Sequence, residues 1–123
     1  MATLHLGDIA YARSGDKGSG ANVGVIARTP AAYEFLRRTL SADAVERFFK
    51  PLGVGRVVRY DLPNLGAFNF LLPGVLDGGG SLNLRIDAQG KALGQAILEM
   101  PLEVPDETLA ELLPPSPVPT EGT

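Results

Sequence analysis

The stretch ARSGDKGSGANVG, residues 12–24, lies between two apolar runs near the N-terminus. It holds four glycines and two serines together with an Arg, an Asp and a Lys. Ordering so many glycines costs conformational entropy, so a small domain keeps such a segment only for a structural or functional reason. The flanking residues 3–12 and 22–28 have the apolar patterns of strands. We therefore expect residues 12–24 to form a loop between two strands.

Two interpretations of this loop are open. Glycines let backbone N–H groups approach an anion closely, Arg13 and Lys17 would add positive charge, and Ser14 and Asn22 would orient a ligand. The stretch contains neither a Walker phosphate loop nor G-x-G-x-x-G, and a strand rather than a helix is expected after it. The alternative is a hairpin connection with Asp16 and Lys17 in solvent.

The segment after the second strand carries the signals of two helices. Thr29 is placed to cap a helix that has Pro30 at its first position, and Ser41 is placed to cap a second helix. Pro51 and Gly53 would end the second helix. Apolar residues at helical spacing would face the core, and these are Tyr33, Leu36, Leu40, Val45, Phe48 and Phe49.

The middle of the chain is partly ambiguous. Residues 55–62 predict a strand because they are rich in β-branched and aromatic residues. Residues 63–80 contain apolar residues at helical spacing, but Pro73 fits badly inside a helix. Asn64 either lines a polar spot in an apolar pocket or caps that helix, and we prefer the cap. For Asn69, the sequence does not choose between a polar spot in an apolar pocket and a structural role.

The C-terminal third predicts further strands and then a change of composition. Residues 81–87 alternate as a strand does, and a turn follows them. Residues 92–102 fit a strand, which we prefer, and also a helix. Residues 106–113 predict a short amphipathic helix within a proline-rich end. Strands and helices in mixed order in 123 residues indicate an α+β fold, a two-layer sandwich.

Composition excludes several classes of function. The chain has no Cys and one His, His5, so a thiolate metal site or a Ser-His-Asp triad in one chain is not expected, and neither is a cofactor. His5 and Asp8 alone do not make a metal site. No apolar run reaches the length of a membrane span, and no secretion signal is seen, so we expect a cytoplasmic protein.

Charge is divided unevenly along the chain. Residues 1–98 hold 11 basic and 8 acidic side chains, whereas residues 99–123 hold 6 acidic and no basic side chains. The basic excess of the body is small and scattered. Binding to nucleic acid is therefore not expected.

Three stretches in the same order resemble one family. They are GDIAYARSGDKGSGANVGVIAR, RYDLPNLGAFNFLLPGVLDGGG and LRIDAQGKALGQAILEM. Over residues 4–102 the chain resembles the small ferredoxin-fold domain of the AtuA-like proteins, named for acyclic terpene utilisation. The resemblance implies a ferredoxin-like α+β fold, with a mixed or antiparallel sheet and helices packed on one face. It assigns no catalytic residue. The positions that the family stresses match Arg13, Ser14, Gly15, Asp16, Lys17, Gly18, Asn22, Pro63, Asn64, Asn69 and Gly90.

The resemblance also implies a context. In the family this domain usually accompanies a much larger domain. Within this chain we expect residues 1–102 to form the AtuA-like domain and residues 103–123 to form an acidic, proline-rich and partly disordered tail. The expected function is that of a small subunit or interaction module in acyclic terpene or acyl-CoA catabolism. Its expected partners are a second copy of the chain, a large AtuA-like chain and an anionic small molecule. The alternative is a stand-alone oligomeric enzyme or ligand-binding protein that acts on an acyl-CoA or carboxylate compound.

Two groups of residues form the candidate site. The candidate loop comprises Arg13, Ser14, Gly15, Asp16, Lys17, Gly18 and Asn22. The candidate neighbouring wall comprises Asn64 and Asn69.

Overall fold

The computed structural model describes residues 2–17, 20–74 and 93–113, and for Asp16 and Lys17 it describes the backbone alone. The described strands are β1 (Ala2–His5), β2 (Ala10–Lys17), β3 (Gly20–Ala27), β4 (Val58–Leu62), β5 (Ala67–Leu72) and β6 (Pro101–Val104). The labelled α-helices are α1 (Pro30–Thr39), α2 (Ala42–Phe49) and α4 (Asp106–Leu112), and residues 93–97 are also helical. Single 3-10 turns are η1 (Leu6–Asp8), η2 (Lys50–Leu52) and η3 (Pro63–Leu65).

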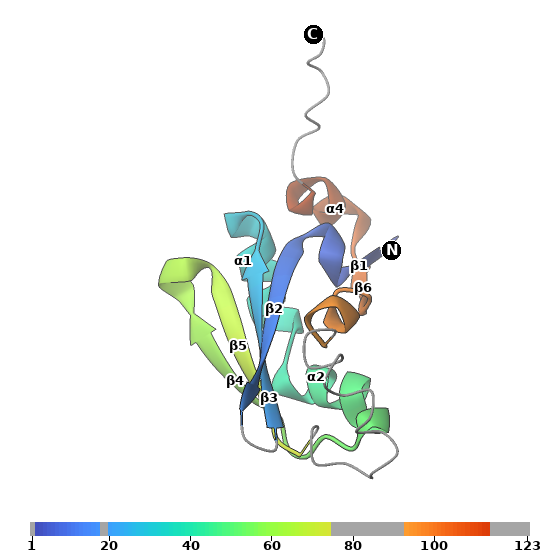
Figure 1. Ribbon diagram of the computed structural model, residues 1–123. Helices are drawn as coiled ribbons and strands as arrows, with labels where there is room; N and C mark the ends of the chain where they lie inside the picture. The colour runs from blue at the N-terminus through green and yellow to red at the C-terminus, as the bar shows by residue number, and fades with distance from the viewer. Residues whose placement is uncertain (1, 18–19, 75–92, 114–123) are drawn as a thin grey trace, which may run out of the picture.

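The described strands form two antiparallel sheets. The larger sheet has the order β2-β3-β5-β4, and β1 pairs with β6 in a separate two-stranded sheet. Buried residues of α1, α2 and residues 93–97 join those of β3 and β5 in one core. The helices therefore cover one face of the four-stranded sheet, and the α+β class with its helices on one face is confirmed (Figure 1).

Several local predictions are confirmed. The Thr29 hydroxyl oxygen accepts a 3.0 Å hydrogen bond from the Ala32 N–H, and the Ser41 hydroxyl oxygen accepts one from the Ala44 N–H. The strand predicted at residues 22–28 is β3, and β4 lies inside the predicted strand 55–62. The short helix predicted at residues 106–113 is α4.

The loop predicted at residues 12–24 is wrong. Residues 12–17 belong to β2 and residues 20–24 belong to β3, with an unbroken register from Ala10↔Ala27 to Lys17↔Gly20. The ladder to β5 holds β3 in the centre of the sheet, and Val23 and Val25 are fully buried there. Pairing on both sides and burial of one face outweigh the low strand propensity of glycine. Gly18 lies outside the described residues.

The first predicted strand and the helix after Pro63 are also corrected. The turn η1 divides residues 3–12 between β1 and β2. Within this turn the Gly7 N–H donates a 2.9 Å hydrogen bond to the Leu98 carbonyl oxygen. Beyond η3 the chain forms β5, because burial alternates with the period of a strand. Asn64 is an exposed residue inside η3 and caps no helix, since Leu62 holds the N-cap position without a side-chain hydrogen bond.

The C-terminal third differs from the prediction at residues 92–102. Residues 93–97 form a helix because Leu93 and Ile97, four residues apart, are both buried. The strand predicted at residues 92–102 is thus wrong except at its end, where β6 begins. Both β6 and α4 extend into the predicted tail, residues 103–123, with Val104 and Leu112 in the core. The strand predicted at residues 81–87 and its turn lie outside the described residues.

Candidate functional site

The face of the four-stranded sheet turned away from the helices presents a continuous surface. Side chains alternate between the two faces of a strand, and directly paired residues share a face. The residues that alternate with the core positions therefore define what we call the open face. They are Tyr11, Arg13, Gly15, Asn22, Gly24, Ile26, Val58, Tyr60, Leu62, Ala67, Asn69 and Leu71.

One row of this face combines a cation, a bare backbone, an amide and a phenol. The register pairs Arg13 with Gly24, Gly24 with Asn69, and Asn69 with Tyr60. Gly24 has no side chain, so it leaves a gap two strand spacings wide, about 10 Å, between the Cα atoms of Arg13 and Asn69. Arg13 is exposed, and no hydrogen bond or ion pair joins it to another side chain within the described residues.

Two asparagines join β3 to β5 on the open face. The Asn22 Nδ2 group donates a 3.2 Å hydrogen bond to Oδ1 of Asn69, a diagonal neighbour on the next strand. Both side chains are half-buried. The bond uses only the Oδ1 atom of Asn69, so it leaves the Nδ2 group of that residue free to donate to a group above the sheet.

Large apolar groups surround the polar row. Tyr11 and Tyr60 are 54% and 51% exposed, and Val58 and Leu62 are also exposed. The Arg28 guanidinium lies 3.9 Å from the centre of the Tyr11 ring, which is a cation–π contact. Among the described side chains the open face carries no carboxylate. Its charge is therefore positive, and its aromatic content is typical of a binding surface.

The structure brings together only part of the predicted site. Arg13, Gly15, Asn22 and Asn69 share the open face. Ser14 lies on the helix side, where its hydroxyl oxygen accepts a 3.2 Å hydrogen bond from the Gly94 N–H.

The remaining predicted residues are not placed with them. The Asp16 backbone pairs with Ala21 at a core-side register position. The Lys17 backbone pairs with Gly20 at the end of the hairpin. Asn64 lies in η3, beyond the end of the sheet, so it does not join Asn69 in a wall.

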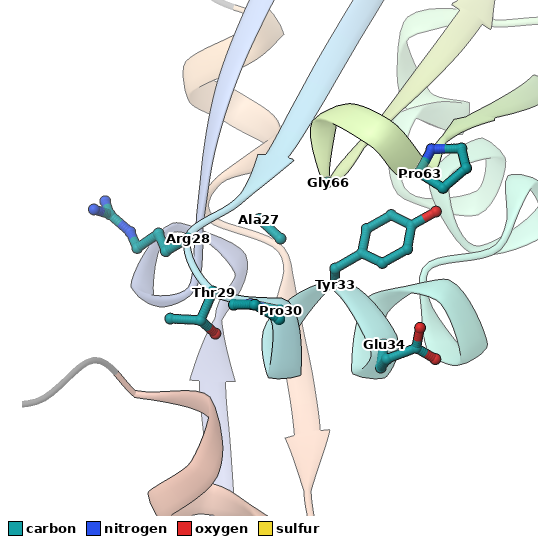
Figure 2. A pocket seen from close by; sticks show the side chains of 8 residues that line it. All are labelled: Ala27, Arg28, Thr29, Pro30, Tyr33, Glu34, Pro63 and Gly66. Atoms are coloured by element: carbon teal, nitrogen blue, oxygen red, sulfur yellow. The ribbon is translucent and has the colours of Figure 1, made fainter.

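Within the part of the chain that the structure describes, hollows adjoin the sheet at two places, and none of the predicted site residues lines either hollow. The first, about 370 Å³, is lined by Ala27, Arg28, Thr29, Pro30, Tyr33, Glu34, Pro63 and Gly66. Figure 2 shows the Tyr33 ring beside Pro63 and the Arg28 side chain pointing away from both. The second, about 320 Å³, is lined by Gly20, Ala21, Arg56, Val58, Leu71, Leu72 and Pro73. Val58 and Leu71 make the second hollow continuous with the open face.

Three polar side chains of the first hollow, those of Arg28, Thr29 and Glu34, already have partners within the fold. The Glu34 carboxylate forms an ion pair with Arg37 at 2.9 Å, and this hydrogen-bonded carboxylate raises the pKa of the guanidinium. The Thr29 hydroxyl oxygen caps α1, and Arg28 donates to the Gly7 carbonyl oxygen at 3.3 Å. The open face, which keeps an unpaired Arg13 and a free amide, is therefore the better candidate site.

The residues of the open face that sequence reasoning missed include Tyr11, Gly24 and Tyr60. Each occupies a strand position between residues of the opposite face, and Tyr60 reaches the row only through the pairing of β4 with β5. The available signal was alternation. In NVGVIAR the apolar Val23 and Val25 alternate with Gly24, which places Gly24 on the other face.

The comparisons with known proteins agree with this fold. The AtuA ferredoxin-like domain family matches residues 4–103, so the chain belongs to that family. No curated protein and no solved structure matches the chain. Within the described residues, no helix is long and apolar enough to cross a membrane.

Proposed function

We propose that this AtuA ferredoxin-like domain is an interaction module that docks a large AtuA-like chain on the open face of its sheet. The observation that carries the proposal is the gathering of four predicted site residues with two exposed tyrosines on a face that no described helix covers. A face whose described side chains include an unpaired Arg and exposed aromatic rings but no carboxylate has the composition of a protein-binding surface.

The docked complex would work in the catabolism of acyclic terpenes or their acyl-CoA derivatives, the context that the family name implies. The exposed tyrosines and the Arg of the open face favour an interaction role over catalysis by the domain alone. Arg13 would help to attract an acidic partner.

The first test identifies the partner. The tagged domain is purified from its own cells, and a large AtuA-like chain that accompanies it in stoichiometric amount is then produced separately for binding measurements. Recovery of the domain alone, combined with calorimetric binding of CoA, phosphate or a short carboxylate, would support the ligand-binding alternative instead.

A matched pair of leucines tests the surface. Leu62 on the open face and Leu113 after α4 are 39% and 38% exposed. We expect Leu62→Ser to weaken binding of the large chain at least about tenfold, since a lost interface contact of about 1.4 kcal/mol has that effect. Leu113→Ser should leave the affinity unchanged. Equal effects of the two substitutions would contradict docking on the open face.

A further inference from the structure

Gly24 is a glycine for which this fold gives no reason. It lies in the interior of β3, paired with Arg13 on one side and Asn69 on the other. Its φ is not among the positive values of the described glycines, and the register passes through it without a bulge. A Cβ built on it would meet only two carbonyl oxygens, at 3.9 and 4.0 Å, which is ordinary van der Waals contact.

Other glycines near the sheet do have structural reasons. A Cβ on Gly20 would lie 2.7 Å from the Leu72 carbonyl oxygen, which real Cβ atoms essentially never do. A Cβ on Gly94 would press against the backbone of Arg13 and Ser14 at 3.3 Å. A Cβ on Gly15 would lie 3.3 Å from Oδ1 of Asn22, so that glycine makes room for the asparagine pair. Among these four glycines, Gly24 is the one at which a Cβ would make only ordinary van der Waals contacts.

Glycine weakens the interior of a strand, and where no bulge or bend requires it, it marks close approach of another group to the backbone. The residues that flank Gly24 on the neighbouring strands offer side-chain donors, namely the unpaired Arg13 guanidinium and the Nδ2 group of Asn69. These donors favour an entering group that accepts hydrogen bonds, and an Arg favours a carboxylate because its planar fork matches two oxygens.

We propose that the partner inserts a carboxylate side chain over Gly24, between Arg13 and Asn69. The proposal rests on the proposed function and adds the chemistry of the contact. The occupant is an Asp or Glu of the large AtuA-like chain, which approaches the sheet backbone because Gly24 carries no Cβ.

The charge of the open face disfavours a second copy as the occupant. In a two-fold pairing of open faces, each Arg13 would meet a face whose described side chains include no carboxylate. The two guanidinium groups would also lie in the same interface, where like charges repel. A heterologous partner with an acidic contact is therefore the better fit.

The test compares variants of the full chain for binding of the purified large chain. Gly24→Ala places one carbon atom in the gap, and we expect the affinity for the large chain to fall about tenfold. Gly24→Val places three carbon atoms there, and we expect the affinity to fall at least about a hundredfold. The melting temperature should stay unchanged or rise, because alanine and valine suit a strand better than glycine does. Gly55→Ala, whose Cβ would meet Pro73 at 3.5 Å and whose φ is not positive, is the control with unchanged affinity.

A second pair of variants tests the carboxylate. Arg13→Gln should weaken binding about tenfold or more and reduce its dependence on salt, and Arg13→Lys should restore part of the charge without the two-pronged contact. Normal binding by Gly24→Val, or unchanged salt dependence in Arg13→Gln, would overturn the inference and leave the proposed function intact. Failure of the unchanged domain to bind would overturn the proposed function itself. Binding of acetate or succinate to the domain alone, lost in Arg13→Gln, would overturn the assignment to a protein carboxylate.

Discussion

The amide of Asn22 donates a 3.2 Å hydrogen bond to that of Asn69, joining β3 to β5 across 47 residues of sequence on the face without helices. The bond is partly buried, so it is partly shielded from competing water. It also aligns the free Nδ2 group of Asn69 beside Gly24. The same pair thus stabilises the sheet and orients one side of the candidate site.

A double-mutant cycle measures the coupling of this pair. We expect Asn22→Ala and Asn69→Ala each to destabilise the domain, and the double variant to lose less than their sum by about 0.5–1.5 kcal/mol, the usual net value of one hydrogen bond. Urea unfolding of the four proteins gives the free energies. Losses that add within about 0.3 kcal/mol would show that the bond contributes nothing to stability.

Arg59 should depend on its shape as well as its charge. The Nη1 group of Arg59 donates to the Arg37 and Leu40 carbonyl oxygens at 3.1 and 3.0 Å. The Nε group of Arg59 forms an ion pair with the Asp61 carboxylate at 2.8 Å. A lysine keeps the charge but cannot make these contacts together. Arg59→Lys should therefore lower the free energy of unfolding by about 1–2 kcal/mol.

The control for this prediction is Arg38→Lys. Arg38 donates one exposed 3.3 Å hydrogen bond to the Glu34 carbonyl oxygen. Arg38→Lys should therefore change the free energy of unfolding by no more than about 0.5 kcal/mol. Thermal and urea unfolding measure both variants. A harmless Arg59→Lys would mean that charge alone explains the role of Arg59.

The helix α4 should be part of the cooperative fold. Leu112 is 1% exposed and belongs to the core, whereas its neighbour Leu113 is 38% exposed. We expect Leu112→Ala to lower the free energy of unfolding by about 2–4 kcal/mol, the usual effect of truncating a buried leucine to alanine. Leu113→Ala should lower it by about 0.5 kcal/mol or less. Urea unfolding compares the two. Similar small losses would show that α4 is not required for the stability of the domain.

Local signals in the sequence predicted much of the fold. Thr29 and Ser41 are caps because a hydroxyl oxygen at that position satisfies a backbone N–H of the first helical turn, which depends only on neighbouring residues. The strand at residues 22–28 and the α+β class followed from equally local patterns. The family resemblance over residues 4–102 is confirmed by the match over residues 4–103.

The errors in the predicted secondary structure arose where the spacing of apolar residues fits both a helix and a strand. Phe68 and Leu72 lie four apart, as on one face of a helix, but with Phe70 they also alternate as in a strand. Pairing with β3 on one side and β4 on the other decides for the strand, and no local pattern contains that pairing. The glycines of residues 12–24 misled for the same reason, because a central position in a sheet overrides their low strand propensity.

The site was predicted by residue type and not by face. Arg13 and Ser14 are neighbours in sequence, yet Arg13 lies on the open face and Ser14 contacts Gly94 on the helix side, because successive strand residues point opposite ways. Tyr60 joins the row only through the register of β4 with β5. Sequence chemistry thus suggested four residues of the open face, and the pairing register was needed to assemble it.

Protection of tyrosines tests the central claim, docking on the open face, most directly. The chain has three tyrosines, of which Tyr11 and Tyr60 are 54% and 51% exposed on the open face and Tyr33 is 9% exposed and stacked on Phe68. The domain is nitrated with tetranitromethane, alone and in complex with the large AtuA-like chain, and each tyrosine is quantified by mass spectrometry. We predict that Tyr11 and Tyr60 react in the free domain and are protected in the complex, while Tyr33 reacts slowly in both. Nitration of Tyr11 and Tyr60 at the same rate in the complex as in the free domain would contradict docking on this face.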